Sequence, residues 1–186
     1  MGGIRFEDNG DVTIITGTLD YGQGHAVAFA QVLHSFLGIP FERIKLLQGD
    51  SDELITGGGT GGSKSIMASG GAIIEAATEV IKKAKTVASY FFETSEGDIE
   101  FKNGNLTVAG TDKSVSLIEL SSELKTNFTK PDGIPDTLDV KLDHGGVPSA
   151  FPNGCHICEV EIDPDTGAVK IDRYNTVSYT HLTLPT

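Results

Sequence analysis

Basic residues are the clearest shortage in this chain of 186 residues. It has 14 Lys and Arg against 26 Asp and Glu, which gives a formal net charge of −12 at pH 7. The phosphate backbone of DNA or RNA requires a basic surface, so this composition argues against nucleic acid as a main partner. The acidic residues are dispersed and form no run of five or six, which indicates a solvated acidic surface rather than an acidic tail.

Long apolar runs are also missing. No stretch of the sequence approaches the roughly 18 consecutive apolar residues that a membrane-spanning helix needs. The segment from Met1 to Glu7 lacks the basic start and apolar core of a secretory signal, so the expected location is the cytoplasm. A hydrophobic content of 38% is nevertheless typical of a globular protein with one reasonable core or two small ones.

Cysteine is scarce, and the two that occur stand together in Cys155-His156-Ile157-Cys158. A lone CxxC can indicate a redox pair or part of a zinc site. Here it runs into an alternating stretch, residues 158–162, that is typical of a strand, whereas redox pairs favour helix N-termini. A zinc site would need two more ligands. We therefore expect both cysteines to pack as small hydrophobic residues, and a disulfide or metal role is the less favoured alternative.

The remaining pattern predicts an α+β chain of β-hairpins and two to three packed helices. Two β-branched runs, residues 4–8 and 12–18, flank Asn9-Gly10-Asp11 and predict a hairpin. Apolar residues three and four apart predict a helix from residue 26 that ends at Gly38. A strand is expected over residues 41–48, and a second, longer helix is expected from Ser65 to about Phe91.

A change of composition at residues 94–97 divides the chain into a first α+β unit, residues 1–95, and a second, residues 96–177. The second unit is expected to hold hairpins around residues 102–105 and 163–167. A short helix over residues 116–124 is predicted to begin with a capping box of Ser116 and Glu119. Residues 126–153 are rich in Pro, Asp and Gly and are expected to form a long surface loop.

The last nine residues, 178–186, break every pattern before them. They carry no charge, have no clear period, and resemble a peptide translated from sequencing-adapter DNA. We therefore treat them as a non-native tail, and we expect the natural protein to continue past Val177.

Two glycine-rich turns stand where the two longer helices are expected to begin. The first is Gly22-Gln23-Gly24-His25, and the second runs from Gly57 to Ser65. A bare turn at a helix N-terminus offers unpaired backbone N–H groups and a positive dipole potential, which together suit phosphate or another anion. Two such turns joined by one helix and one strand indicate a large anionic ligand that is held at several points.

Familiar phosphate motifs fail on the second turn. A Walker A loop needs Gly-Lys-Ser/Thr in direct succession, but Ser63 separates Gly62 from Lys64. Gly57, Gly59 and Gly62 satisfy GxGxxG formally. A Rossmann turn, however, follows its strand at once and needs an acidic residue at the end of a second strand, whereas Glu79 lies within the predicted helix.

Simpler structural explanations compete with the ligand hypothesis at each position. A flexible glycine loop has no need of Ser63-Lys64-Ser65 at a helix start, where a mobile ammonium and two hydroxyls can bind phosphate oxygens. For Gln23 and His25, a helix cap and a structural hydrogen bond remain strong alternatives. Asp50 and Asp52 lack the spacing of a calcium loop, so a role in a turn is favoured.

Taken together, these blocks resemble one family. The order of Gly22-Gln23-Gly24-His25, Gln48-Gly49-Asp50-Ser51-Asp52 and Gly59-Thr60-Gly61-Gly62-Ser63-Lys64-Ser65 is similar to that in the molybdopterin-binding large subunit of molybdenum hydroxylases. These are the xanthine dehydrogenase, aldehyde oxidase and aerobic-type carbon monoxide dehydrogenase family. Residues 152–164 and 166–169 also resemble a segment of the bacterial members, and the likeness extends over roughly residues 4–177.

The resemblance implies an interior fragment of an oxidoreductase that carries a molybdenum–molybdopterin cofactor, usually the cytosine dinucleotide form in bacteria. Carried over by position, the cofactor-binding residues would be Gln23, Gly24, His25, Thr60, Gly61, Gly62, Ser63, Lys64 and Ser65. Two departures bear on affinity: Lys64 stands where the family often has arginine, and Val27 stands where threonine is common. Ser51 in place of threonine is a benign change.

The resemblance also implies what lies elsewhere. The intact enzyme would hydroxylate a heteroaromatic or aldehyde substrate, or oxidise carbon monoxide, with water as the oxygen source. Electrons would leave through iron–sulfur and FAD units on partner subunits or domains. The family's catalytic glutamate and substrate loop fall outside these 186 residues, so no catalytic or metal-ligating residue is assigned and the fragment alone is expected to be inactive. The competing hypothesis is a non-catalytic module that binds a nucleotide or another phosphate ligand.

Overall fold

A computed structural model describes residues 1–126, 132–145 and 153–179. The chain separates into two compact units, Met1–Pro148 and Ser149–Thr186. The predicted division at residue 95 therefore differs from the division of the structure. The reason is that segments on both sides of residue 95 contribute side chains to the same hydrophobic core, among them Val87, Ile99 and Leu117.

The first unit is built on a four-stranded sheet in the order β3-β2-β1-β7. Strands β1 (Gly2–Phe6) and β2 (Val12–Thr16) form the predicted hairpin, and Gly10 adopts a φ of 82° in its turn. Strand β3 (Ile44–Gln48) pairs parallel with β2, so α1 (His25–Leu37) forms the crossover between them. A 3-10 turn, η1 (Phe41–Arg43), precedes β3, which shortens the predicted strand at its start.

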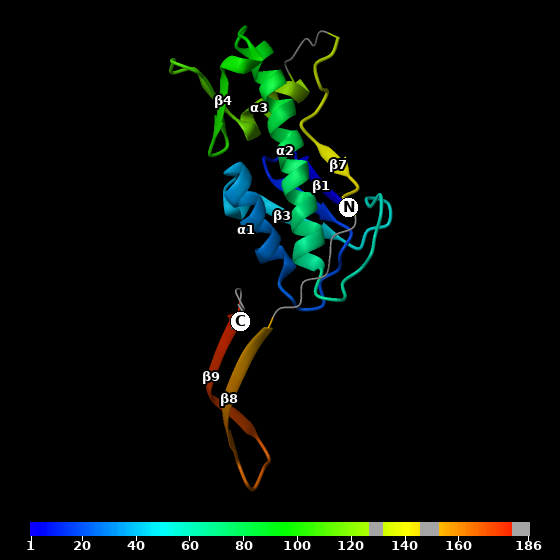
Figure 1. Cartoon of the computed structure of the whole chain (residues 1–186), viewed down its shortest axis with the longest axis vertical. Coiled ribbons are helices and arrows are strands. Elements are labelled where there is room, and N and C mark those ends of the chain that lie inside the picture. The colour runs from blue at the N-terminus through cyan, green and yellow to red at the C-terminus, as the bar shows by residue number, and fades with distance from the viewer. Residues whose placement is uncertain (127–131, 146–152, 180–186) are drawn as a thin grey trace, which may run out of the picture. The chain divides into compact units, whose positions relative to one another are not determined.

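Helix α2 (Ser65–Phe91) confirms the predicted long helix, which begins at Ser65 and includes Phe91 as expected. It packs beside α1 and across strands β1 and β7 (Val140–Leu142), as Figure 1 shows. Strand β7 lies within the segment that we expected to be a loop, and it pairs antiparallel with β1 through three residue pairs. That part of the loop prediction was wrong, because three residues are too few to show strand alternation in the sequence.

A smaller sheet in the order β4-β5-β6 completes the first unit. Its strands are β4 (Ile99–Lys102), β5 (Asn105–Val108) and β6 (Ser114–Ser116), preceded by the 3-10 turn η2 (Glu96–Asp98). The predicted hairpin is confirmed: Asn103 and Gly104 form its two-residue turn, both with positive φ, as such turns require. Helix α3 (Leu117–Thr126) follows β6 directly.

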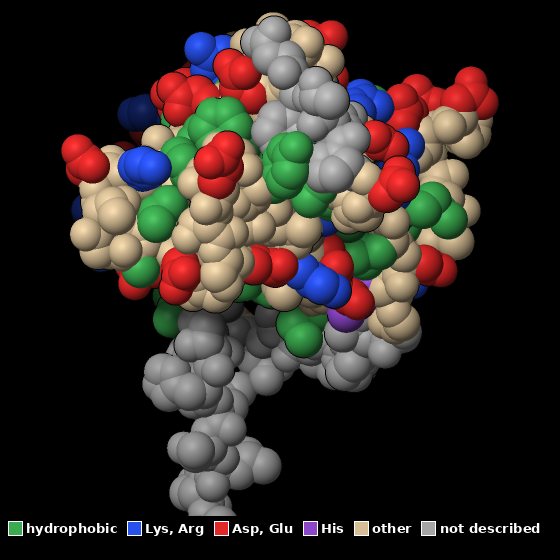
Figure 2. All heavy atoms as spheres, turned by 90° about the horizontal axis from the view of Figure 1, so that it is seen from above, with side chains coloured by type: hydrophobic (Ala, Val, Ile, Leu, Met, Phe, Trp, Pro, Cys, Tyr) green, Lys and Arg blue, Asp and Glu red, His purple; other side chains and the backbone are tan. Residues whose placement is uncertain are grey.

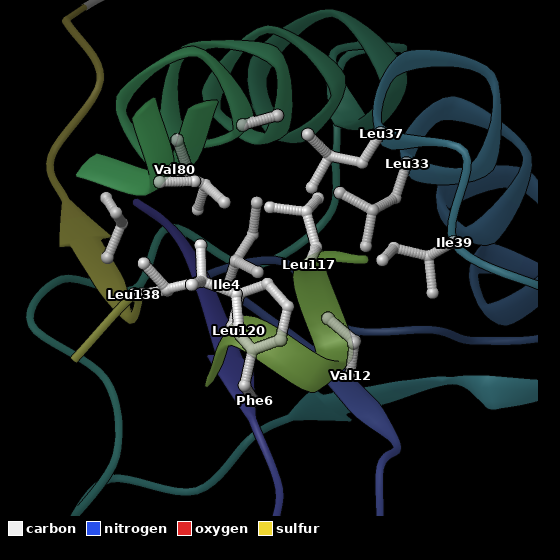
Figure 3. Packing of buried hydrophobic residues seen from close by; sticks show 14 of the residues in the cluster. Ile4, Phe6, Val12, Leu33, Leu37, Ile39, Val80, Leu117, Leu120 and Leu138 are labelled. Atoms are coloured by element: carbon white, nitrogen blue, oxygen red, sulfur yellow. The ribbon is translucent and has the colours of Figure 1, made fainter. Parts of the chain in front are cut away.

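One hydrophobic core joins these elements. Figure 3 shows apolar side chains from both long helices, β1 and α3 meeting in a single packed region. The members that it labels are Ile4, Phe6, Val12, Leu33, Leu37, Ile39, Val80, Leu117, Leu120 and Leu138. Small side chains on α2, such as Ala76 and Ala77, are fully buried and allow the helix to pack closely on its neighbours. This core holds the starts of α1 and α2 in fixed positions.

The second unit is a two-stranded hairpin of β8 (Asn153–Ile162) and β9 (Val169–Tyr179). It confirms the third predicted hairpin and extends it, since Ser178 and Tyr179 belong to β9. That residues 178–186 are a non-native tail stays a prediction. Residues 180–186 lie outside the described residues. Cys155 and Cys158 are free and exposed on β8, so the expectation that they pack as buried hydrophobic residues was wrong for this unit. Their odd spacing places them on opposite faces of the strand.

The dispersed acidity of the sequence is visible on the surface. Figure 2 shows Asp and Glu side chains spread over one face of the molecule among Lys and Arg. Within the described ranges, no helix has the length and apolar character that crossing a membrane requires.

Ser116→Ala is expected to lower the free energy of unfolding by about 1 kcal/mol, because it breaks the start of α3. The predicted capping box is present: Glu119 N donates to Ser116 Oγ at 3.1 Å, and Ser116 N donates to Glu119 Oε2 at 3.1 Å. Urea unfolding of the two proteins measures the difference. Ser122→Ala changes an exposed residue within the same helix. It is the control and should not lower the free energy of unfolding. Equal losses for both variants would contradict a capping role.

Candidate anion-binding site

The structure brings the two glycine-rich turns together through the segments beside them. Gly58 N and Gly59 N donate to Gly17 O at 3.0 and 3.1 Å. Thr60 Oγ1 donates to Leu19 O at 2.6 Å and accepts from Leu19 N at 3.2 Å. A Cβ on Gly17 would lie 2.4 Å from Thr56 O, so this close approach requires glycine. Residues 17–19 and 57–60 therefore form one connected base for both helix starts.

A buried polar network lies beneath this base. Thr18 Oγ1 is 3.0 Å from Ser69 Oγ, and Gln48 Nε2 donates to the hydroxyls of Thr16 and Thr18 at 2.8 and 3.0 Å. Gln48 Nε2 also lies 3.3 Å from His25 Nδ1. The network links the end of β3 to His25, the first residue of α1, and to Ser69, the fifth residue of α2, so it ties the two helix starts together.

The His25 side chain belongs to this network and not to the open surface. It is only 4% exposed, and its ring stacks on Phe29 with the centroids 4.8 Å apart. This agrees with the alternative in which the His25 side chain makes a structural hydrogen bond. Gln23 and Gly24, by contrast, are exposed at the surface of the turn.

The start of α1 is already capped by a carboxylate from its own chain. Asp20 Oδ1 accepts from the N–H groups of Gly22 and Gln23, and Asp20 Oδ2 accepts from His25 N, all at 2.7 Å. Desolvation raises the pKa of Asp20, but hydrogen bonds from His25, Gly22 and Gln23 outweigh it and hold that pKa below its ordinary value. This turn therefore contains an anion, which sequence reasoning missed.

The start of α2 is different, because it has no such cap. Gly62 and Ser63 have φ values of 62° and 53°, and Lys64 makes no side-chain capping bond. Within the described part of the chain, the backbone N–H groups of residues 63–67 have no hydrogen-bond partner. Successive unpaired N–H groups at the positive end of a 27-residue helix, next to a lysine ammonium, provide an anion site.

Two glycines of the second turn are not explained by the fold. Gly58 and Gly61 do not adopt positive φ, and a Cβ on either would meet no atom within 4 Å. Neither backbone conformation nor internal packing therefore requires glycine at these positions. Because these glycines leave the backbone uncovered, a ligand or a partner could approach it closely at both positions.

A cleft of about 360 Å³ adjoins this turn. It is lined by Gly57, Gly58, Gly59, Lys64 and Ser69, among others, and by the segment after β7. In that segment His144 Nδ1 lies 2.6 Å from Glu75 Oε2, so α2 holds the histidine at the edge of the cleft. Sequence reasoning did not identify His144, because its position depends on β7.

A larger hollow of about 710 Å³ lies elsewhere, between the β1–β2 turn and α3. Its cations are already paired with local anions. Lys125 Nζ donates to Asp8 Oδ1 at 2.8 Å, and Arg43 Nη1 lies 3.5 Å from Asp11 Oδ1. This hollow therefore offers less to an anion than the start of α2. Among the described residues there is also no cluster of three or more His, Cys, Asp or Glu that could hold a metal ion.

Comparison with known proteins agrees with the motif resemblance. A family model described as a molybdopterin cofactor-binding domain matches residues 2–178. The nicotine 6-hydroxylase large subunit of Paenarthrobacter nicotinovorans is 35% identical over 176 residues, which cover 94% of this chain and 22% of that protein. The 6-hydroxypseudooxynicotine dehydrogenase complex subunit gamma of the same organism is 31% identical over 94% of this chain and 22% of its own length.

A solved structure of a related enzyme shares the fold of this chain. Reconstituted CO dehydrogenase from Oligotropha carboxidovorans superposes with a TM-score of 0.75 at 30% sequence identity, over 95% of this chain and 22% of that one. The chain thus spans about a fifth of the length of the proteins that it matches. Its match to the family model runs through both units and ends at residue 178. The chain belongs to the molybdopterin cofactor-binding domain family, and it is similar to one part of the large subunits of molybdenum hydroxylases.

Proposed function

We propose that this chain holds the phosphate-bearing part of a molybdenum–molybdopterin cofactor, in its cytosine dinucleotide form, at the start of α2. The observation that carries the proposal is the uncapped N-terminus of α2, with unpartnered N–H groups over residues 63–67 in the described part of the chain. An anionic group fits these donors, since they offer hydrogen bonds and positive potential together. The open space over Gly58 and Gly61 would let that group approach the backbone.

Each part of the site has a distinct task in this proposal. The N–H groups of residues 63–67 bind the pyrophosphate oxygens, and Lys64 adds a mobile positive charge. Thr60 orients the second turn through its bonds to Leu19. Ser65 Oγ, which donates to Thr60 Oγ1 at 3.2 Å, steadies the first residue of α2. Gln23 and Gly24 face the part of the cofactor that lies beyond the pyrophosphate.

When bound, the cofactor supplies the redox and oxygen-transfer chemistry, and the protein supplies orientation and electrostatics. For the intact enzyme we propose oxidative hydroxylation of a heteroaromatic or aldehyde substrate, or oxidation of carbon monoxide, with oxygen taken from water. The names of two relatives, a large subunit and a complex subunit gamma, support a hetero-oligomer. We propose that the partner subunits carry the iron–sulfur and FAD groups, and that the complex is cytoplasmic. The 186-residue chain alone is expected to be inactive.

The nucleotide released from the intact large subunit tests the cofactor assignment. Mild acid hydrolysis followed by chromatography should yield cytidine monophosphate together with an oxidised pterin. A different base would overturn the cytosine dinucleotide form. Recovery of a nucleotide without any pterin would instead favour the alternative of a nucleotide-binding module.

A further inference from the structure

The β8–β9 hairpin has two chemically different faces over residues 158–174. Residues directly opposite each other in an antiparallel pair lie on the same face of the sheet. One face, the apolar face, consists of three pairs without charge: Cys158 opposite Tyr174, Val160 opposite Ile171, and Ile162 opposite Val169. The other face carries two pairs of opposite charge, Glu159 with Arg173 and Glu161 with Lys170. This separation is typical of a sheet that is covered on one side and solvated on the other.

A bulge in β9 produces the separation. Ile171 and Arg173 pair with neighbouring residues of β8, so Asp172 between them is an extra residue without a partner. Strict alternation without this bulge would place Arg173 on the same face as Ile171. The bulge instead brings Tyr174 to the apolar face and Arg173 to the charged face. The register of the hairpin therefore keeps one face free of charge.

Tyr174 suits the apolar face in spite of its hydroxyl group. Tyr174 Oη lies 3.1 Å from His156 Nδ1, and the two rings meet edge to face with their centroids 6.0 Å apart. The polar end of the side chain thus has a partner within the hairpin. The rest of the ring can be covered without leaving the hydroxyl unsatisfied.

The apolar face is not covered within its own unit. Its larger side chains are between 50% and 64% exposed: Val160, Ile162, Val169, Ile171 and Tyr174. In the described part of the chain, β8 and β9 pair only with each other. A two-stranded hairpin is marginally stable at best in water, and it needs further strands or a packed second layer. A contiguous apolar face of this kind marks a surface that another element covers.

We propose that the apolar face is an internal interface of the intact large subunit, covered by an apolar layer of the same polypeptide that lies outside these 186 residues. The family model matches residues 2–178 and so includes the hairpin. The CO dehydrogenase chain that superposes on 95% of this chain has only 22% of its own length in that match. A subunit of that length has ample further polypeptide to supply the layer.

The marginal stability of a lone hairpin favours a layer from the same polypeptide over a partner subunit or a second copy. A segment of the same polypeptide acts at a high effective concentration, and it loses little translational freedom when it packs. It is also present while the subunit folds, whereas an apolar face that waits for another molecule is exposed to aggregation. The absence of charge from all six residues of the apolar face is likewise typical of a domain core.

Hydrogen exchange measured by mass spectrometry tests the proposal. The amides of residues 158–174 are followed in the 186-residue chain and in the intact large subunit. The subunit is measured both within its complex and after separation from the other subunits. We expect fast exchange in the 186-residue chain and slow exchange in the large subunit in both states, because the covering layer travels with its own polypeptide.

Ile171→Gln and Lys170→Gln are a matched pair, since they introduce the same residue at neighbouring positions on opposite faces. In the separated large subunit, Ile171→Gln should speed the exchange of the hairpin amides by roughly 10- to 100-fold, as expected for the loss of one buried aliphatic side chain. Lys170→Gln should leave the exchange unchanged, because Lys170 Nζ makes only an exposed ion pair with Glu161 Oε2 at 3.6 Å. Equal effects of the two variants would contradict the proposal.

Four results with the unchanged protein would overturn the proposal, whether or not a variant folds. Slow exchange in the 186-residue chain would mean that these residues cover the face themselves. Slow exchange only within the complex would assign the cover to a partner subunit. Slow exchange that is lost when the separated subunit is diluted to a monomer would assign it to a second copy. Fast exchange in every sample would leave the face uncovered.

Discussion

Gly61→Val is expected to remove most of the molybdenum from the intact large subunit without lowering its stability. A Cβ at Gly61 would meet no atom of the chain within 4 Å, and the residue does not adopt positive φ, so we expect the folded protein to accommodate a side chain there. The same side chain would occupy the space through which the cofactor approaches the α2 start. Steric overlap of this kind costs about 1 to 3 kcal/mol, which corresponds to a loss of affinity of roughly 5- to 150-fold.

The measurement is the molybdenum content per subunit, combined with thermal unfolding of the same samples. Gly97→Val serves as the matched control, because Gly97 is exposed, does not adopt positive φ and lies in η2 rather than in a glycine-rich turn. The control should retain the molybdenum content of the unchanged protein. Full molybdenum in Gly61→Val would show that nothing approaches the backbone there and would contradict the proposed site.

Gly38→Ala is expected to lower the free energy of unfolding by roughly 2 to 5 kcal/mol. Gly38 ends α1 with a φ of 69°, and its N–H donates to His34 O at 2.8 Å. A Cβ at this position would lie 2.4 Å from the carbonyl carbon of Asn103 and 2.6 Å from Gly104 N. The turn of the β4–β5 hairpin thus packs directly on the end of α1, and backbone on both sides prevents easy relief.

A matched variant separates the cost of a left-handed backbone from the cost of the steric clash with the hairpin turn. Gly110 also has a positive φ, 74°, but a Cβ there would meet nothing within 4 Å. Gly110→Ala should therefore show only the cost of the left-handed backbone, about 1 to 2 kcal/mol. Denaturant unfolding of both variants measures the difference. Equal losses of unfolding free energy in the two variants would mean that the close contact between Gly38 and the hairpin turn adds nothing to the cost of the substitution.

Local patterns were enough to predict the elements that surround the site. The helical period over residues 65–91 led to α2 with its start at Ser65 correct, and the turn residues Asn103 and Gly104 led to the β4–β5 hairpin. These features depend on neighbours within a few residues along the chain, where propensity and periodicity act. The glycine-rich turns were placed at the helix starts for the same reason.

What could not be predicted depends on contacts between distant segments. Strand β7 pairs with β1 more than 130 residues away in the sequence, and its three residues carry no period of their own. The exposure of Cys155 and Cys158 likewise follows from a hairpin that packs within its own unit. Pairings of this kind are decided by tertiary structure and override local preference.

The site itself was predicted only in part. Its residues could be located by motif, but the sequence did not distinguish the two helix starts. Asp20 stands two residues before Gly22 in a pattern that is common in turns, and only the three hydrogen bonds of its carboxylate show that it caps α1. The assignment of Gln23, Gly24, His25 and residues 60–65 to cofactor binding remains a prediction.

The most direct test of the central claim is the molybdenum and pterin content of the intact large subunit that contains this chain. The subunit is purified from its native complex, the metal is measured by mass spectrometry, and the pterin is measured by fluorescence after acid oxidation. The account predicts about one molybdenum and one pterin per folded subunit, as a single site of this kind requires. A folded complex that contains neither would contradict it.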